Sequence, residues 1–224
     1  MKQIIPGLYY FTGLMVGRVY CIEDSDGLTI IDASIPPAAD RIIKQLIAAG
    51  HAPNEVKRIL ITHGHPDHCG GLPRLQQMTG AEVYASAVER PSIQGEEPIV
   101  RAPGPIRPPN TTLKPTPVHH TVADGEKLPV FGGLIALHTP GHSPGHVSFW
   151  QPEKKVLFVG DVLFNMPRLS LPWFPMTADA ELNKKSVKRV AELDAQVVCF
   201  GHGNPLMPDG GQKIKVFAQK IGVM

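Results

Sequence analysis

Four side chains able to bind a metal ion fall within six residues, His63-Gly64-His65-Pro66-Asp67-His68. The preceding residues 58–62 are mostly apolar and predict a buried strand, and loops on a rigid scaffold commonly carry functional side chains. Alternate residues of an extended backbone point to the same side, so His63 and His65 could share one ion. Asp67 and His68 follow as the chain turns and could serve a second ion. Imidazole and carboxylate ligands together suit zinc and similar divalent metals.

Three more candidate ligands come after predicted strands or before one. His146 ends a turn rich in Gly and Pro, Thr139-Pro140-Gly141-His142-Ser143-Pro144-Gly145-His146, and begins a strand. Asp161 follows Gly160 and the apolar residues 156–159, and His202 follows Gly201 and the apolar residues 197–200. A single aspartate after a strand is usually a turn former or a helix cap. The recurrence of strand, glycine and ligand favours one shared metal site instead.

Short apolar runs and helical patterns predict two β-sheets with helices outside them, an α+β fold. Strands are expected near residues 4–5, 8–11, 19–22, 28–31, 58–62, 82–85, 134–138, 147–150, 156–159 and 196–200. A first helix is expected between Ser34, as its cap, and Gly50, with an apolar stripe of Ile42, Ile43, Leu46 and Ile47. Further helices are expected at 72–78, at 180–193 and after Gly211. Residues 1–224 are expected to form one domain with a Pro-rich irregular loop at 91–117, either a lid or a partner surface.

The composition argues against several classes of protein. The 224 residues carry 22 Lys and Arg against 20 Asp and Glu, a formal charge of +2, which disfavours nucleic-acid binding through bulk positive charge. The sequence has no run of 18 apolar residues, and its N-terminus lacks the pattern of a signal peptide. Three cysteines do not suit a disulfide framework. We expect a cytoplasmic protein without a nucleic-acid or membrane partner, and the oligomeric state stays open.

Together these motifs resemble the metallo-β-lactamase superfamily over nearly the whole chain, from the first strands to His202. The resemblance implies a four-layer αβ/βα sandwich of two mixed sheets flanked by helices. It implies two divalent metal ions, zinc by first expectation and iron or manganese as alternatives. The implied ligands are His63, His65 and His146 for the first ion, Asp67, His68 and His202 for the second, and Asp161 as a bridge.

The family site implies a hydrolase. Two cations about 3.5–4 Å apart lower the pKa of a bridging water and stabilise the developing oxyanion. Asp67 is expected to orient the resulting hydroxide and to pass its proton to the leaving group. Asp32, at a strand end, is the candidate acceptor for the other N–H of a ligand histidine, with a helix cap as the alternative. The substrate is expected to be a small molecule with an ester, lactone or thioester bond.

Alternatives remain open at this stage. A phosphodiesterase could use the same dinuclear site, and a mononuclear iron enzyme resembling persulfide dioxygenases is the rival from another class. Asp161 resembles the carboxylate of glyoxalase II-like thioesterases, lactonases and phosphodiesterases. Against glyoxalase II, 22 residues follow His202, too few for its helical glutathione-binding domain. Against the lactonases, Phe164 stands where they use a tyrosine.

Other residues are expected to have lesser roles. His142 is interpreted as a turn residue near the site, and Cys69 as a small buried residue rather than a thiolate ligand. The apolar, Pro-rich residues 164–176 follow Asp161 closely. They could form a wall of a small-molecule pocket, or they could simply pack against the rest of the fold.

Overall fold

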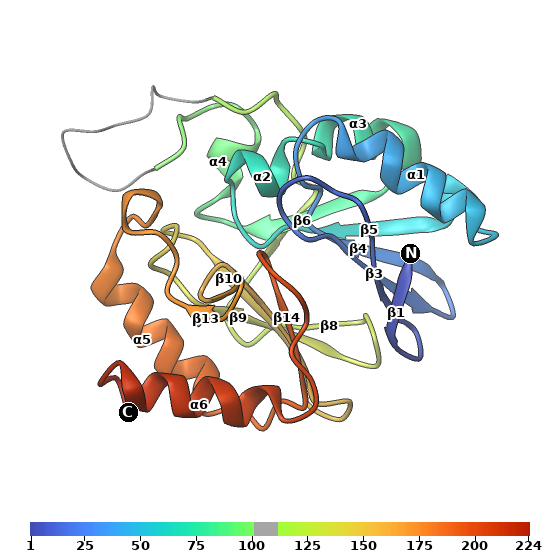
Figure 1. Cartoon of the computed structure of the whole chain (residues 1–224). Helices are drawn as coiled ribbons and strands as arrows, with labels where there is room; N and C mark the ends of the chain where they lie inside the picture. The colour runs from blue at the N-terminus through green and yellow to red at the C-terminus, as the bar shows by residue number, and fades with distance from the viewer. Residues whose placement is uncertain (101–111) are drawn as a thin grey trace. The chain divides into compact units, whose positions relative to one another are not determined.

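The computed structural model describes residues 1–100 and 112–224, which form two compact units. Of the described residues, the first unit comprises Met1–Ile99 and residues 112–122, and the second comprises Val100 and Ala123–Met224. Each unit contains one large mixed sheet with helices against it (Figure 1). The predicted α+β class, with two sheets flanked by helices, is therefore confirmed. That residues 1–224 form one domain stays a prediction.

The first unit is built on a seven-stranded sheet in the order β1 to β7. Neighbouring strands from β1 to β4 are antiparallel and those from β4 to β7 are parallel. The strands are β1 (Lys2–Ile5), β2 (Leu8–Tyr10), β3 (Tyr20–Asp24), β4 (Gly27–Ile31), β5 (Val56–Leu60), β6 (Glu82–Ser86) and β7 (His120–Val122). The helices are α1 (Ala38–Ala48), the 3-10 turn η1 (Pro53–Glu55), α2 (Pro66–Cys69), α3 (Leu72–Thr79) and α4 (Arg90–Ile93).

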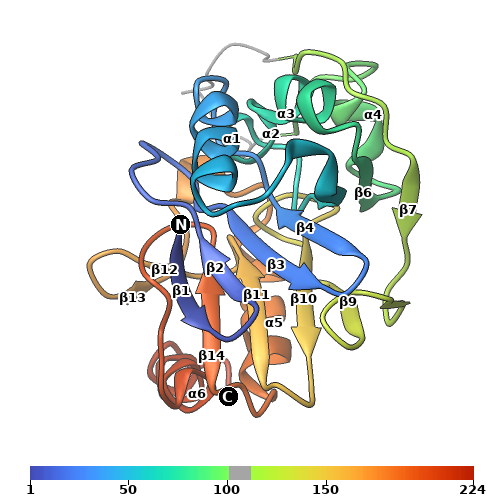
Figure 2. The same ribbon diagram turned by 90° about the vertical axis from the view of Figure 1, so that its right-hand side faces the viewer.

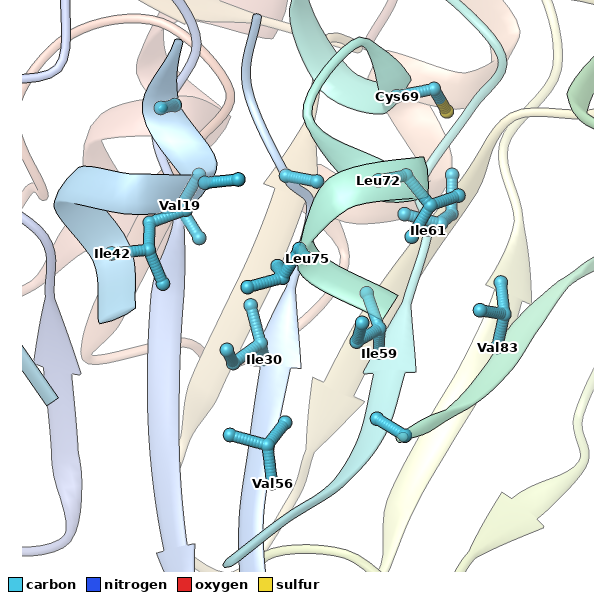
Figure 3. Close-up of a cluster of buried hydrophobic side chains, with 14 of the residues drawn as sticks. Val19, Ile30, Ile42, Val56, Ile59, Ile61, Cys69, Leu72, Leu75 and Val83 are labelled. Carbon is cyan, nitrogen blue, oxygen red and sulfur yellow. The ribbon is translucent and has the colours of Figure 1, made fainter. Parts of the chain in front are cut away.

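A buried apolar cluster joins helices α1 and α3 to this sheet. Ile42 of α1 and Leu75 of α3 meet Ile30 and Ile59 of the central strands (Figure 3). Truncating such a side chain to alanine typically costs about 2–5 kcal/mol, because a cavity is left behind. The cluster therefore fixes the carboxyl end of β5, from which the histidine-rich loop leaves.

Two predictions for α1 differ in their outcome. The apolar stripe is largely correct, since three of its members are buried, although Ile47 is 58% exposed. The prediction that Ser34 caps the helix is wrong, because α1 begins at Ala38 with Pro37 at its N-cap. Ser34 has a left-handed backbone, φ 56°, and donates its hydroxyl to the carbonyl of Val16. Its side chain therefore closes the loop before β3 instead of the helix end.

The second unit is built on a five-stranded sheet in the order β14-β11-β10-β9-β8. All of its strand pairs are antiparallel except β11 with β14. Helices α5 and α6 lie beside this sheet (Figure 2). Val187 of α5 and Ile214 of α6 belong to the same buried apolar cluster as Phe200 of β14. The strands are β8 (Lys127–Leu128), β9 (Leu134–His138), β10 (Val147–Gln151), β11 (Val156–Gly160) and β14 (Val197–Phe200), with a separate pair β12 (Phe164–Asn165) and β13 (Leu169–Ser170). The helices are the 3-10 turn η2 (Phe174–Met176), α5 (Ala180–Ala191) and α6 (Gly210–Lys220).

The Pro-rich segment 91–117 is described only in part, because residues 101–111 lie outside the described residues. In the remainder, Arg90–Ile93 forms the single-turn helix α4 and residues 112–119 run without helix or strand. Across the described ranges, no helix combines the length and the apolar character needed to cross a membrane.

Candidate metal-binding residues

The first unit gathers three buried imidazoles in the loop between β5 and α3. Ligand atoms of His63 lie within 4.8 Å of those of His65 and of His68. All three residues are buried, at 2% exposure or less. His65 has extended backbone and is the N-cap of α2, where Pro66 starts the helix and His68 follows one turn later. The loop that the sequence singled out therefore brings its histidines together.

Close backbone contacts hold this loop in place. A Cβ atom added to Gly71 would lie 2.3 Å from the carbonyl oxygen of Ala33, so only glycine fits there. The backbone N–H of Ala33 donates to the carbonyl of His68 at 2.8 Å. The buried carboxylate of Glu89 accepts the N–H of Gly64, between the first two histidines, at 2.9 Å. The loop is therefore anchored at both ends by the rest of the first unit.

Asp32 and Thr62 fix the protonation of two of these histidines. Asp32 Oδ2 lies 2.8 Å from Nδ1 of His68, and Thr62 Oγ1 lies 2.9 and 3.0 Å from the two carboxylate oxygens. The carboxylate only accepts hydrogen bonds, so the Thr62 hydroxyl donates to it and must accept from His63 Nδ1, 3.0 Å away. Both imidazoles thus carry their proton on Nδ1 and leave Nε2 as the ligand atom. The predicted role of Asp32 as an acceptor for a histidine N–H is confirmed.

Asp67 and Cys69 flank His68, and their side chains differ in exposure. Asp67 Oδ2 is 3.9 Å from Nε2 of His68, and its side chain is 24% exposed. Cys69 is a small buried residue, as predicted, and donates its Sγ–H to the carbonyl of His63 at 3.1 Å. Burial, with the nearby negative charges of Asp32, Glu89 and Asp67, raises the pKa of the Cys69 thiol well above its usual value. Cys69 therefore stays a thiol that holds the backbone.

The second unit gathers a carboxylate and two imidazoles. Asp161 Oδ2 lies 3.3 Å from Nε2 of His202 and 3.3 Å from Nε2 of His142. Asp161 and His142 are each 2% exposed, and the side chain of His202 is 12% exposed. The ring of Phe164 lies 4.6 Å from that of His202, centroid to centroid. His142, Asp161 and His202 come from the loop before β10 and from the ends of β11 and β14, so the sheet assembles the group.

His146 lies in the same unit, beside Asp161. Its Nε2 accepts the backbone N–H of Asp161 at 3.0 Å, and its Nδ1 lies 2.9 Å from the hydroxyl of Thr139. The histidine is fully buried, so these contacts hold its ring next to Asp161.

His142 lies in the turn before β10 and beside Asp161, which agrees with its interpretation as a turn residue near the site. A Cβ on Gly141, whose φ is +135°, would lie 2.2 Å from the backbone nitrogen of Asn183, so the loop is held against α5. The sequence analysis missed Thr62, Glu89 and Thr139, because nothing in the sequence links a hydroxyl or a distant carboxylate to a histidine.

Comparison with known proteins identifies the family. The family described as Metallo-beta-lactamase superfamily matches residues 12–202. The chain belongs to this superfamily. Its members use metal ions, and the histidine and aspartate groups described above could bind such ions.

Individual superfamily relatives extend over most of the chain. The "Probable metallo-hydrolase YybB" of Bacillus subtilis is 30% identical and covers 85% of this chain and 82% of its own length. The hydroxyacylglutathione hydrolase GloC of Haemophilus influenzae is 34% identical, over 81% of this chain and 82% of its own. A metallo-beta-lactamase family protein of Thermus thermophilus, 24% identical, has the same fold with a TM-score of 0.77 over 98% of this chain and 80% of its own.

Proposed function

We propose that the chain is a dinuclear metal-dependent hydrolase that cleaves an ester, lactone or thioester bond of a small molecule. The observation that carries the proposal is the hydrogen bonding of the buried imidazoles. His63 and His68 each commit Nδ1–H to a protein acceptor and keep Nε2 for an ion. Such partners orient ligand histidines and raise their basicity. The nitrogen and oxygen donors of this set suit zinc first, with iron or manganese as alternatives.

The proposed ligand set starts from the seven residues expected from the sequence. His63 and His65 bind the first ion together with a histidine of the turn before β10, Asp67, His68 and His202 bind the second, and Asp161 bridges them. His146 is the histidine that the sequence indicates for the first ion, and its Nε2 lies 3.0 Å from the backbone nitrogen of Asp161. His142 of the same turn is the alternative, because its Nε2 lies 3.3 Å from Asp161 Oδ2, as does that of His202.

The bound ions would lower the pKa of a water molecule toward neutrality and polarise the substrate carbonyl. The chain's own contribution to proton movement is assigned to Asp67. Its Oδ2 is partly exposed and lies beside His68, so it can hold the attacking water through a hydrogen bond and accept its proton. It can then return that proton to the leaving oxygen or sulfur, as a general acid does.

The substrate is proposed to have an apolar part that contacts Trp173 and Phe174. Their exposed fractions are 66% and 68%, high for aromatic residues. Thr177 connects them to the candidate ligands, since its hydroxyl donates to the carbonyl of Trp173 at 3.0 Å and lies 3.5 Å from His142 Nδ1. Exposed aromatic surface this near a ligand-bearing loop suits an acyl chain, because ligand sites are mostly apolar with a few polar groups.

Metal analysis and a matched substrate panel test the proposal. The zinc-loaded protein is assayed with an acyl lactone, a glutathione thioester and a chromogenic phosphodiester, and His63→Gln, His142→Gln and His146→Gln serve as site variants. Two zinc ions per chain and carbonyl hydrolysis abolished in His63→Gln are expected, and loss of one ion in the His142 or the His146 variant identifies the third ligand of the first ion. Preference for the phosphodiester would overturn the carbonyl assignment. One iron per chain, no zinc and oxygen uptake would overturn the hydrolase.

The apolar contact has its own test. Trp173→Ala and Phe174→Ala are compared with Ile47→Ala, an equally exposed apolar residue on α1. Losing about half of an aromatic contact area removes about 1–1.5 kcal/mol, so kcat/KM for long-acyl substrates should fall about tenfold. Short-acyl substrates and the Ile47 variant should be little affected. An equal loss for short and long acyl groups would argue against the contact.

A further inference from the structure

The buried carboxylate of Glu89 contacts the backbone between two proposed metal ligands. We propose that Glu89 is a positioning residue: it holds the N–H of Gly64 and so fixes the directions in which the side chains of His63 and His65 leave the chain. The inference rests on the proposed function in taking these two histidines as metal ligands. It concerns residues of the first unit alone.

The topology of the first sheet brings Glu89 to this position. Strands β4, β5 and β6 are parallel neighbours, so their carboxyl ends lie at the same edge of the sheet. The histidine-rich loop follows β5, Asp32 follows β4, and Glu89 comes shortly after β6. Each neighbouring strand therefore supplies one buried carboxylate to the loop. Asp32 accepts the N–H of Thr62 at 2.9 Å, and Glu89 accepts that of Gly64 at the same distance.

Several contacts hold Glu89 itself in place. Its own N–H donates to the hydroxyl of Ser86 at 3.2 Å, and its carbonyl accepts the N–H of Ile93 at 3.0 Å. The end of α4 is held in turn, since the N–H of Thr116 donates to the carbonyl of Ile93 at 3.2 Å. Glu89 is 5% exposed, so water does not readily replace its carboxylate as the acceptor.

Gly64 lets this carboxylate come close to the backbone. A Cβ atom at Gly64 would lie 2.8 Å from Glu89 Oε2, whereas the nearest atoms of Ser92 and Ile93 would be in ordinary contact at 3.6 and 3.8 Å. The N–H of Gly64 belongs to the planar peptide group that joins it to His63, so holding this hydrogen restricts rotation about the bonds on either side of the plane. The rings of His63 and His65 lie 4.6 Å apart, centroid to centroid, at an angle of 77°. A rotation of this peptide would change that arrangement.

Two variants of nearly the same size test the hydrogen bond. Glu89→Gln loses the charge but keeps an oxygen that can accept the N–H of Gly64. Glu89→Met fills a similar volume, but its thioether is only a weak acceptor. Glu97→Met, which replaces an exposed carboxylate in the same part of the chain, is the control. Competition with a chromophoric chelator measures zinc affinity, and the visible absorption spectrum of the cobalt-loaded protein reports the geometry of the ligands.

Glu89→Met should weaken the binding of one zinc ion about 10–100-fold, the usual effect of removing a group that supports a ligand, and should change the cobalt spectrum. Glu89→Gln should lose at most about tenfold, through its missing charge, and should keep the native cobalt spectrum. Glu97→Met should change neither. The inference is overturned if Glu89→Met lowers only the stability of the metal-free protein in urea. It is also overturned if Glu89→Gln changes the cobalt spectrum as much as Glu89→Met does.

A double-mutant cycle keeps the inference testable if Glu89→Met fails to fold. Gly64→Ala places a methyl group against the carboxylate and should weaken zinc binding by displacing it. Glu89→Ala removes the oxygen that this methyl group would meet, so the double variant should bind zinc about as well as Glu89→Ala alone. Losses that simply add in the double variant would overturn the inference, because residues that act through one contact are not independent.

The outcomes for this inference and for the proposed function can be told apart. If the substrate panel shows no hydrolysis while the zinc and cobalt results hold, the proposed function fails and the role of Glu89 stands. Hydrolysis by the native protein, with unchanged zinc binding and cobalt spectrum in Glu89→Met, would support the proposed function and overturn the role of Glu89.

Discussion

Replacing Asp32 separates its contribution to stability from its contribution to metal binding. Asp32 accepts three buried donors at 2.8–3.0 Å: the backbone N–H and the hydroxyl of Thr62, and Nδ1–H of His68. Asp32→Ala leaves all three without this acceptor. Asp32→Asn keeps one carboxyl-like oxygen for Thr62 but presents an NH2 group to His68. The two substitutions should therefore fail in different ways.

The expected magnitudes follow from those contacts. Each buried donor left without an acceptor costs about 1–3 kcal/mol, although the hydroxyl and the imidazole can partly relax. Asp32 also has a left-handed φ of 63°, which alanine adopts at a cost of about 1–2 kcal/mol and asparagine tolerates. We expect Asp32→Ala to lower the free energy of unfolding by about 3–5 kcal/mol, as for other broken buried pairs. Asp32→Asn should lower it by only about 1 kcal/mol.

Asp32→Asn, which should change the free energy of unfolding little, should change the metal affinity strongly. Opposite the asparagine NH2, His68 gains by moving its proton to Nε2, which removes the proposed ligand atom. We therefore expect Asp32→Asn to weaken zinc binding about 10–100-fold. Urea unfolding of the metal-free protein and chelator competition measure the two effects separately. Asp40→Asn, an exposed residue paired with Arg74, is the control and should change neither. Native zinc affinity in Asp32→Asn would refute the reasoning.

Two further predictions concern stability. Gly17 and Gly80 have nearly the same left-handed φ, 68° and 71°. A Cβ atom on Gly17 would lie 2.0 Å from the carbonyl oxygen of Asp67, whereas a Cβ atom on Gly80 would have no atom within 4 Å. Gly17→Ala should therefore destabilise the chain by at least about 2 kcal/mol more than Gly80→Ala in urea unfolding, and equal losses would contradict this contact. Separately, the hydrogen bond to Glu55, opposed by partial burial and assisted by a second glutamate, raises the pKa of His51. A histidine whose pKa rises on folding stabilises the native state below about pH 6.5, and this stabilisation is lost as the pH rises through the pKa of the folded state. His51→Gln should therefore lower Tm at pH 5.5 and not at pH 9. A loss of Tm that is the same at both pH values would contradict this prediction.

The fold was largely readable from the sequence wherever a pattern was local. Short apolar runs located β4, β5, β9, β10 and β11, and helical spacing with Gly at the ends located α1 and α3, because each signal is confined to its own element. The short strands β7, β8, β12 and β13 escaped notice, since two or three residues carry no period. Ser34 was misassigned as a cap because its partner, Val16, is eighteen residues away. Capping propensity reports what a residue commonly does near a helix, not which distant carbonyl reaches it first.

The candidate site was readable to a different degree in each unit. The histidines of the first unit lie within six residues, so their spacing alone indicated that they would meet. In the second unit, His146, Asp161 and His202 are far apart in the sequence, and their expected common role came from the order in which the family motifs occur. That Asp161 and His202 lie 3.3 Å apart depends on the parallel pairing of β11 with β14, which no local pattern of residues specifies.

The different spacing of the two groups of proposed ligands has a consequence for the order in which they would assemble during synthesis. His63, His65 and His68 require only a short loop to close, and Asp32 joins them from a strand paired beside β5. Asp161 and His202 depend on β11 and β14, whose parallel pairing joins residues about 40 positions apart. Closing the longer segment costs more chain entropy and comes later. A nascent chain that has released the first unit, up to Val122, would thus bring its three imidazoles together before β11 and β14 have been synthesised.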